Sequence, residues 1–112
     1  MSNRSAPPGL PSAPVDLVAV AVGSRQVILA WTECGAGGLG FRIERAVCHS
    51  PCKQFAKIGE VGPHVAAFRD GSVDPRTTYS YRVHAWNADG KSSPSNVIGV
   101  TMPRSRTELP AD

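Results

Sequence analysis

The sequence predicts an all-β fold, a seven-stranded antiparallel sandwich. In the segment 79–85 apolar and aromatic residues alternate with polar ones, which is typical of a strand with one buried and one solvated face. Turn-forming residues bound this segment, Asp-Pro-Arg at 74–76 and Asn-Ala-Asp-Gly at 87–90. No segment has the period of an amphipathic helix, and short apolar runs recur at the spacing of sandwich strands.

The first two strands are predicted on either side of a Gly-Ser-Arg turn at 23–25. Pro14–Val22 alternates between two apolar faces, and Gln26–Thr32 places Leu29 and Trp31 on one face. β-branched residues dominate the pair and the turn interrupts it, which excludes one continuous helix.

Five strands are expected beyond the Gly-rich loop at 33–40. They are Gly40–Val47, Gln54–Val61, Val65–Asp70, the strand that begins near Tyr79, and Asn96–Met102. Three of the five hold two apolar residues in phase: Phe41 and Ile43, Ala66 and Phe68, Ile98 and Val100. Gln54–Val61 carries less apolar surface and is predicted as a short edge strand.

The chain has the length of one domain with polar ends. Residues 1–13 are rich in Pro, Ser, Ala and Gly and are predicted as a flexible linker. The folded domain is expected over 14–103, because Pro103 ends the last strand. Residues 104–112 are predicted as a polar tail.

Composition argues against nucleic-acid binding and membrane insertion. The net charge is +3, but the 12 basic residues are scattered rather than gathered on one element. No apolar run approaches the roughly 20 residues that a spanning helix needs. The N-terminus also lacks the apolar core of a secretion signal. We therefore expect either a domain of a longer exported protein or a small complete reading frame.

The segment 73–95 resembles the fibronectin type III domain. It reads Val-x-Pro-x-Thr-x-Tyr-x-Tyr-x-Val-x-Ala-x-Asn-x-x-Gly-x-Ser-x-x-Ser, and the resemblance extends over roughly 14–103. Pro14-x-x-Leu17 is similar to the opening strand of the family and Phe41-x-Ile43 to its third strand. The run 40–61 is closest to modules of secreted bacterial proteins, which often carry two cysteines in this hairpin.

The resemblance implies an immunoglobulin-like sandwich with a tryptophan and a tyrosine in its core. Trp31 corresponds to the core tryptophan of the family. Tyr79 corresponds to its tyrosine corner, in which the phenol bonds upstream backbone. The expected core residues are Trp31, Tyr79, Leu29, Ile43 and Val83.

The three cysteines are expected to form one disulfide. Cys48 and Cys52 flank a tight Pro turn, whose ends approach within disulfide reach. Cys34 lies at the other end of a strand, more than about 20 Å away, and is predicted to be free. A bridge indicates an oxidising, extracellular setting. The alternative is a zinc site made of Cys48, His49, Cys52 and His64, but a fourth ligand is not evident. We expect no metal and no cofactor.

No constellation for catalysis is present in the sequence. There is no Gly-x-Ser-x-Gly elbow and no phosphate loop between a strand and a helix. The carboxylates, Asp70 and Glu44 among them, fall on predicted turns and solvated faces. We therefore predict a protein that is not an enzyme.

Two outward faces are candidate binding surfaces. One joins the Tyr79 strand to the third strand: Trp86, His84, Arg82, Arg42 and Glu44. An exposed indole beside His and Arg is suited to stack on a sugar or anchor a protein. The alternative is a cross-strand ladder, with Glu44 near Arg82 and Trp86 covering Gly99.

The other candidate surface is an apolar face on the opposite sheet. It consists of Val18, Val20, Ile28, Ala30 and Ala67. Contiguous apolar surface favours contact with another domain or subunit, although strands also tolerate valine on a solvated face.

The resemblance and the faces together predict a non-catalytic module for spacing, adhesion, or protein or glycan binding. Its setting would be an extracellular or cell-surface bacterial protein, and its partner a protein, a neighbouring domain or a polysaccharide. The alternative is a small decoration-type subunit of a virion or surface assembly that uses the sandwich for subunit contacts.

Overall fold

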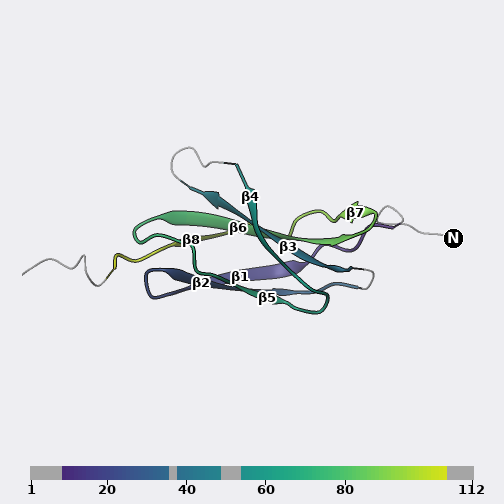
Figure 1. The fold of residues 1–112 in the computed structure, drawn as a ribbon, viewed down its shortest axis with the longest axis horizontal. Coiled ribbons are helices and arrows are strands. Elements are labelled where there is room, and N and C mark those ends of the chain that lie inside the picture. The colour runs from purple at the N-terminus through teal and green to yellow at the C-terminus, as the bar shows by residue number, and fades with distance from the viewer. Residues whose placement is uncertain (1–8, 36–37, 49–53, 106–112) are drawn as a thin grey trace, which may run out of the picture.

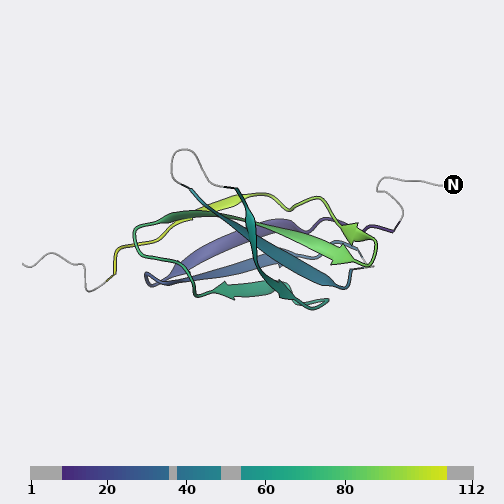
Figure 2. The same cartoon turned by 45° about the horizontal axis from the view of Figure 1, so that its top comes forward.

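The computed structural model describes residues 9–35, 38–48 and 54–105, and these form two facing antiparallel sheets (Figure 1). One sheet has the order β1-β2-β5, from β1 (Val15–Val22), β2 (Gln26–Thr32) and β5 (Ala67–Asp70). The other runs β4-β3-β6-β7, with β8 also paired to β6: β4 (Ala56–Val61), β3 (Gly40–Val47), β6 (Thr78–Asn87), β7 (Gly90–Lys91) and β8 (Ile98–Thr101). Figure 2 shows the two layers from a second side.

The core contains every residue expected there. Leu29, Ile43 and Val83 are fully buried, and Trp31 and Tyr79 are 5% and 3% exposed. Trp31 and Phe41 pack edge-to-face, with their ring centroids 5.4 Å apart. The alternation in the sequence therefore identified the correct faces of β2, β3 and β6.

The prediction of seven strands is wrong by one, because the described residues form eight. The expected last strand, Asn96–Met102, shortens to β8, and the separate short strand β7 precedes it. Between them lies Pro94, which has no N–H to donate to a ladder. A proline at this point divides one sheet edge into two pieces.

Serine side chains continue the pairing where the β7–β8 connection, residues 92–97, leaves the strand geometry. The backbone N–H groups of Ser92 and Ser95 donate to the carbonyls of Ala85 and Val83, each at 2.8 Å. In return, the N–H groups of Val83 and Ala85 donate to the hydroxyls of Ser95 and Ser92, each at 3.0 Å. Hydroxyl oxygens thus replace the carbonyls of a regular strand, and β6 keeps its buried donors satisfied.

The folded domain begins earlier than Pro14. Residues 9–13, expected in the linker, pack against the β6–β7 hairpin: the side-chain amide of Asn87 donates to the Gly9 carbonyl, and Pro11 is buried. Farther along, the Asn96 amide both accepts from the Leu17 N–H at 2.9 Å and donates to its carbonyl at 3.0 Å. These contacts join the start of the chain to its last strands.

Tyr79 forms the expected corner, since its hydroxyl accepts a 2.8 Å hydrogen bond from the backbone N–H of Asp74. We expect Tyr79→Phe to lower the free energy of unfolding by about 1–3 kcal/mol, because the Asp74 N–H loses its acceptor while the ring contacts remain. Urea denaturation with an unchanged m-value would measure this loss. A variant as stable as the wild type would show that water replaces the phenol at no cost.

Candidate functional site

The five polar and aromatic residues expected on one outer face do lie together. Arg42 is paired with His84, and Glu44 with Arg82, across β3 and β6. Trp86 follows on the same face of β6, opposite Gly40. We call these five residues the charged face.

Glu44 is the centre of the charged face. Its carboxylate is 12% exposed and accepts from Arg82 Nε at 2.6 Å, with His84 Nε2 at 3.1 Å and Lys91 Nζ at 3.5 Å. Burial acts to raise the pKa of Glu44, but the hydrogen bond from Arg82 and the charges around it outweigh burial and hold the pKa below its usual value. The ladder between Glu44 and Arg82 that the sequence predicted is present.

His84 is not available to a ligand, contrary to the expectation that it points into solvent. The side chain is 5% exposed, and Nδ1 lies 2.8 Å from the Ser92 carbonyl. The β7–β8 connection covers the ring, whereas the predicted last strand began only at Asn96 and so placed nothing over His84. The pairing of this connection through serine side chains is what brings the Ser92 carbonyl over His84.

Trp86 covers Gly40 rather than Gly99. A Cβ at Gly40 would lie 3.0 Å from Trp86 Nε1 and 2.4 Å from the Val61 carbonyl, so the indole lies directly over a position that only glycine fits. No atom of Trp86 lies within 4 Å of the position that a Cβ at Gly99 would take. Arg42 places its guanidinium 5.1 Å from the ring centre, and this cation occupies the ring surface that a sugar would need.

The two arginines of the charged face also contact residues just outside it. Arg42 Nε donates to Glu60 at 3.1 Å, and the guanidinium of Arg82 lies 4.3 Å from the Phe55 ring centre. Lys57 completes the group with a 3.0 Å contact to Glu60. Most polar groups of the charged face are therefore satisfied by one another or by these neighbouring residues.

The apolar face on the opposite sheet is present, and its members adjoin one another. Register places Val18 beside Ala30 and Ala30 beside Ala67, and the next row joins Val20 to Ile28. Val18 and Val20 are 52% and 58% exposed. Val22, 48% exposed and in the same phase, extends the face, although it was not among the expected residues. From here the apolar face means these six residues.

The sequence did not indicate that one carboxylate, Asp70, is buried. Asp70, expected among the carboxylates on turns and solvated faces, is 3% exposed and accepts from Tyr81 Oη at 2.7 Å and Arg45 Nη1 at 2.9 Å. Ser72 donates to it through its N–H at 3.0 Å and its hydroxyl at 2.7 Å. Burial acts to raise the pKa of Asp70, but the four hydrogen bonds outweigh it and hold the pKa below its usual value. The partners come from β3, β6 and the turn after β5, so no local pattern signals the cluster.

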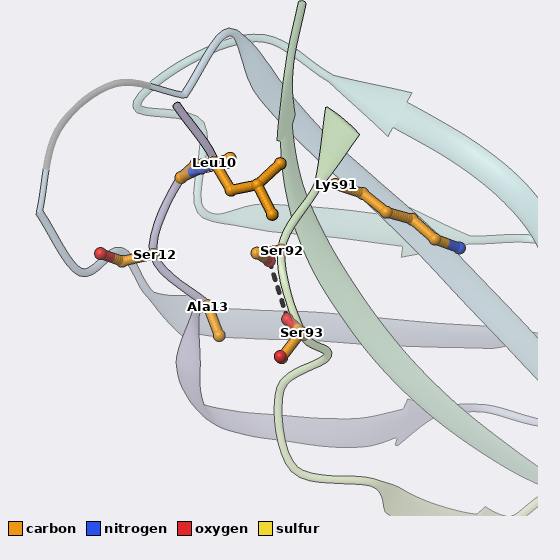
Figure 3. Close-up of a pocket in the computed structure, with 7 residues that line it drawn as sticks. Leu10, Ser12, Ala13, Lys91, Ser92 and Ser93 are labelled. Atoms are coloured by element: carbon orange, nitrogen blue, oxygen red, sulfur yellow. Dashed lines mark hydrogen bonds between the residues drawn. The ribbon is translucent and has the colours of Figure 1, made fainter. Parts of the chain in front are cut away.

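Two shallow grooves lie at the edge near the N-terminal segment. The first, of about 340 Å³, runs between residues 10–13 and 91–93 (Figure 3). The second, of about 510 Å³, follows the outer edge of β1 beside Asn96. Lys91 is the ionisable residue of the first groove and Asp16 that of the second. A lone titratable group does not make an acid–base pair.

The cysteine predictions are only partly covered by the described residues. Cys34 carries a free thiol and is half-buried. Cys48 Sγ lies 3.2 Å from the Ser80 hydroxyl. His49 and Cys52 lie outside the described residues, so the Cys48–Cys52 bridge and the alternative zinc site with His64 stay predictions. In the described part of the chain no three His, Cys, Asp or Glu side chains gather as metal ligands.

Solved structures share this two-sheet arrangement. A human fibronectin type III domain, from fibronectin type III domain containing protein 3, superposes with a TM-score of 0.71 at 24% identity, over 95% of this chain and 97% of that one. The FN5 domain of Drosophila Lar gives 0.68 at 23% identity, over 83% and 97%. The fold is that of a fibronectin type III domain.

Fibronectin type III domains also occur as parts of longer chains among these structures. Against the FN1–FN3 domains of chicken CNTN1 the TM-score is 0.74 at 18% identity, over 84% of this chain and 32% of that one. No protein-family model matches the chain, and no curated protein matches it. Within the described residues there is no helix with the length and apolarity to cross a membrane.

Proposed function

We propose that this fibronectin type III domain is a non-catalytic module that acts by contact with a neighbouring protein domain through its apolar face. The observation that carries the proposal is the exposure of Val18, Val20 and Val22, each about half accessible: 52%, 58% and 48%. Single exposed valines are ordinary on a protein surface, but a contiguous group on one sheet is typical of an interaction site.

The register of the sheet makes the apolar face continuous. Val18, Ala30 and Ala67 form one row across three strands, and Val20 and Ile28 begin the next. Arg69 ends this second row on β5 and supplies a charged rim. An apolar centre with a polar rim is the usual composition of a protein interface.

The charged face is the weaker candidate for binding a protein or a polysaccharide. Its one carboxylate, Glu44, already contacts arginine, histidine and lysine, and Arg42 covers the Trp86 ring. A ligand there would first have to displace internal contacts, which lowers its net gain.

The setting proposed for the module is extracellular or cell-surface, in a bacterial protein. The similarity of the run 40–61 to secreted bacterial modules and the expected Cys48–Cys52 bridge support this setting. The alternative is a subunit of a virion or surface assembly, in which the apolar face would meet another subunit. Self-association separates the two, because a spacer next to another domain has no need to bind its own copies.

A Val18→Thr/Val20→Thr double variant tests the apolar face. Threonine keeps the β-branched shape and the strand propensity but adds hydroxyls, so a buried contact there should weaken while folding is preserved. The matched control is Val97→Thr, because Val97 is 55% exposed and lies in the β7–β8 connection. Binding would be measured by calorimetry against the domains adjacent in the parent protein, and self-association by sedimentation velocity.

We expect the double variant to lose at least about tenfold in affinity, one order of magnitude being about 1.4 kcal/mol, and the control to match the wild type. Equal binding by all three proteins would contradict the proposal. A glycan array with wild type and Trp86→Ala tests the other face: binding that Trp86→Ala abolishes would move the function to the charged face.

A further inference from the structure

His84 lies between two groups that only accept hydrogen bonds. Its Nδ1 atom is 2.8 Å from the carbonyl oxygen of Ser92, and its Nε2 atom is 3.1 Å from Glu44 Oε1. A neutral imidazole carries one N–H, so in either tautomer one ring nitrogen would point a lone pair at an oxygen. Only the doubly protonated ring satisfies both contacts.

We propose that His84 is a proton-dependent clamp, which in its doubly protonated form ties the β7–β8 connection to β3 and releases this tie as the pH rises. The clamp spans three elements. His84 itself belongs to β6, Glu44 to β3, and the Ser92 carbonyl to the connection.

Some charged groups around His84 disfavour a second proton on its ring, and others favour it. Arg42 and Glu44 face it from β3, Arg82 from β6, and Lys91 from β7. The three cations oppose a further positive charge. However, Arg42 contacts Glu60, whereas Arg82 and Lys91 share the Glu44 carboxylate with His84, so the negative charge of Glu44 is divided among three positive groups. The lowered pKa of Glu44 keeps its carboxylate ionised for His84 at neutral pH.

Burial makes the lone-pair contact costly. The His84 residue is only 4% exposed, so little water is present to solvate a deprotonated nitrogen that faces an oxygen. Losing the proton therefore breaks one of the two hydrogen bonds or turns the ring out of its site. Both responses loosen Ser92 from β3.

The connection is the element for which such a tie matters most. Residues 92–95 are held to β6 by the backbone N–H groups and the hydroxyls of Ser92 and Ser95 rather than by a regular ladder, and Pro94 contributes no donor. Lys91, Ser92 and Ser93 also form one wall of the groove against Leu10 and Ala13 (Figure 3). The clamp would thus hold this wall while His84 is doubly protonated and free it as the pH rises and the proton is lost.

The sign of the pH dependence follows from proton counting. The folded protein holds a proton on His84 that the unfolded chain releases near the ordinary histidine pKa of about 6.5. Stability is therefore greatest below that pH and falls as the pH rises. The unfolding equilibrium constant should increase by at most about tenfold per pH unit while His84 alone keeps its proton.

Two measurements on the intact chain test the clamp. Long-range ¹H–¹⁵N NMR at pH values around neutrality should show both nitrogens of His84 protonated in the folded state. Denaturation across the same pH range should show the stability falling in the wild type and in His64→Gln, but not in His84→Gln. His64 is the matched control, because its side chain is 82% exposed.

A neutral tautomer of His84 at pH 6 would overturn the proposal, and so would a wild-type pH slope retained in His84→Gln. If His84→Gln does not fold, the NMR result on the wild type alone decides.

Discussion

Trp31→Ala is expected to lower the free energy of unfolding by about 3–5 kcal/mol, the range for removing a large aromatic side chain from a core. Trp31 is 5% exposed and packs edge-to-face against Phe41. The backbone beside it is fixed by a 3.1 Å hydrogen bond from the Trp31 N–H to the Ala66 carbonyl. This bond holds β2 in place, so the sheet cannot readily collapse into the cavity. Denaturant titration followed by circular dichroism would measure the loss.

Trp31→Phe is the matched control for the cavity. The Trp31 Nε1 atom is buried and has no hydrogen-bond partner in the described residues, so phenylalanine removes no hydrogen bond. It keeps an aromatic contact with Phe41 and leaves a smaller void, and its cost should be well below that of alanine. If alanine were no more destabilising than phenylalanine, the indole would not be the principal packing group of the core.

The parts of the fold that follow from the sequence are those with a local cause. The alternation from Tyr79 to Ala85 predicted which face of β6 is buried, because the period of a strand is set by its backbone. Trp31 and Ile43 were placed in the core for the same reason. The division of the last strand also has a local cause in Pro94, but it was not anticipated.

The candidate sites depend on partners that are distant in the chain. Glu44 and His84 are 40 residues apart, and Asp70 meets Arg45 from 25 residues away. Side-chain type alone placed His84 in solvent and Asp70 among the carboxylates of turns and solvated faces, because polar residues are mostly exposed. Only the pairing of β3 with β6 and the path of the β7–β8 connection show that both are covered.

Asp70→Ala is expected to lower the free energy of unfolding by about 3–5 kcal/mol, as for breaking a buried ion pair from one side. The change leaves the hydroxyl of the fully buried Tyr81 without its acceptor and Arg45, whose side chain is 19% exposed, without its anion. It also removes the carboxylate that orients Ser72 after β5. Asp74→Ala is the matched control, because the Asp74 side chain is 76% exposed and its ion pair in the described residues is a 3.7 Å surface contact with Arg25.

The pH dependence of the same variant distinguishes Asp70 from His84. The pKa of Asp70 is lower in the folded state, so its contribution is present above the unfolded aspartate pKa of about 3.9 and is lost as the pH falls through the folded value. The wild type should therefore lose stability in acid more steeply than Asp70→Ala, whereas the His84 clamp acts near neutrality and in the opposite direction. If stability fell equally steeply at low pH in both proteins, Asp70 would not be ionised in the folded state. The destabilisation by Asp70→Ala would then come from lost packing alone.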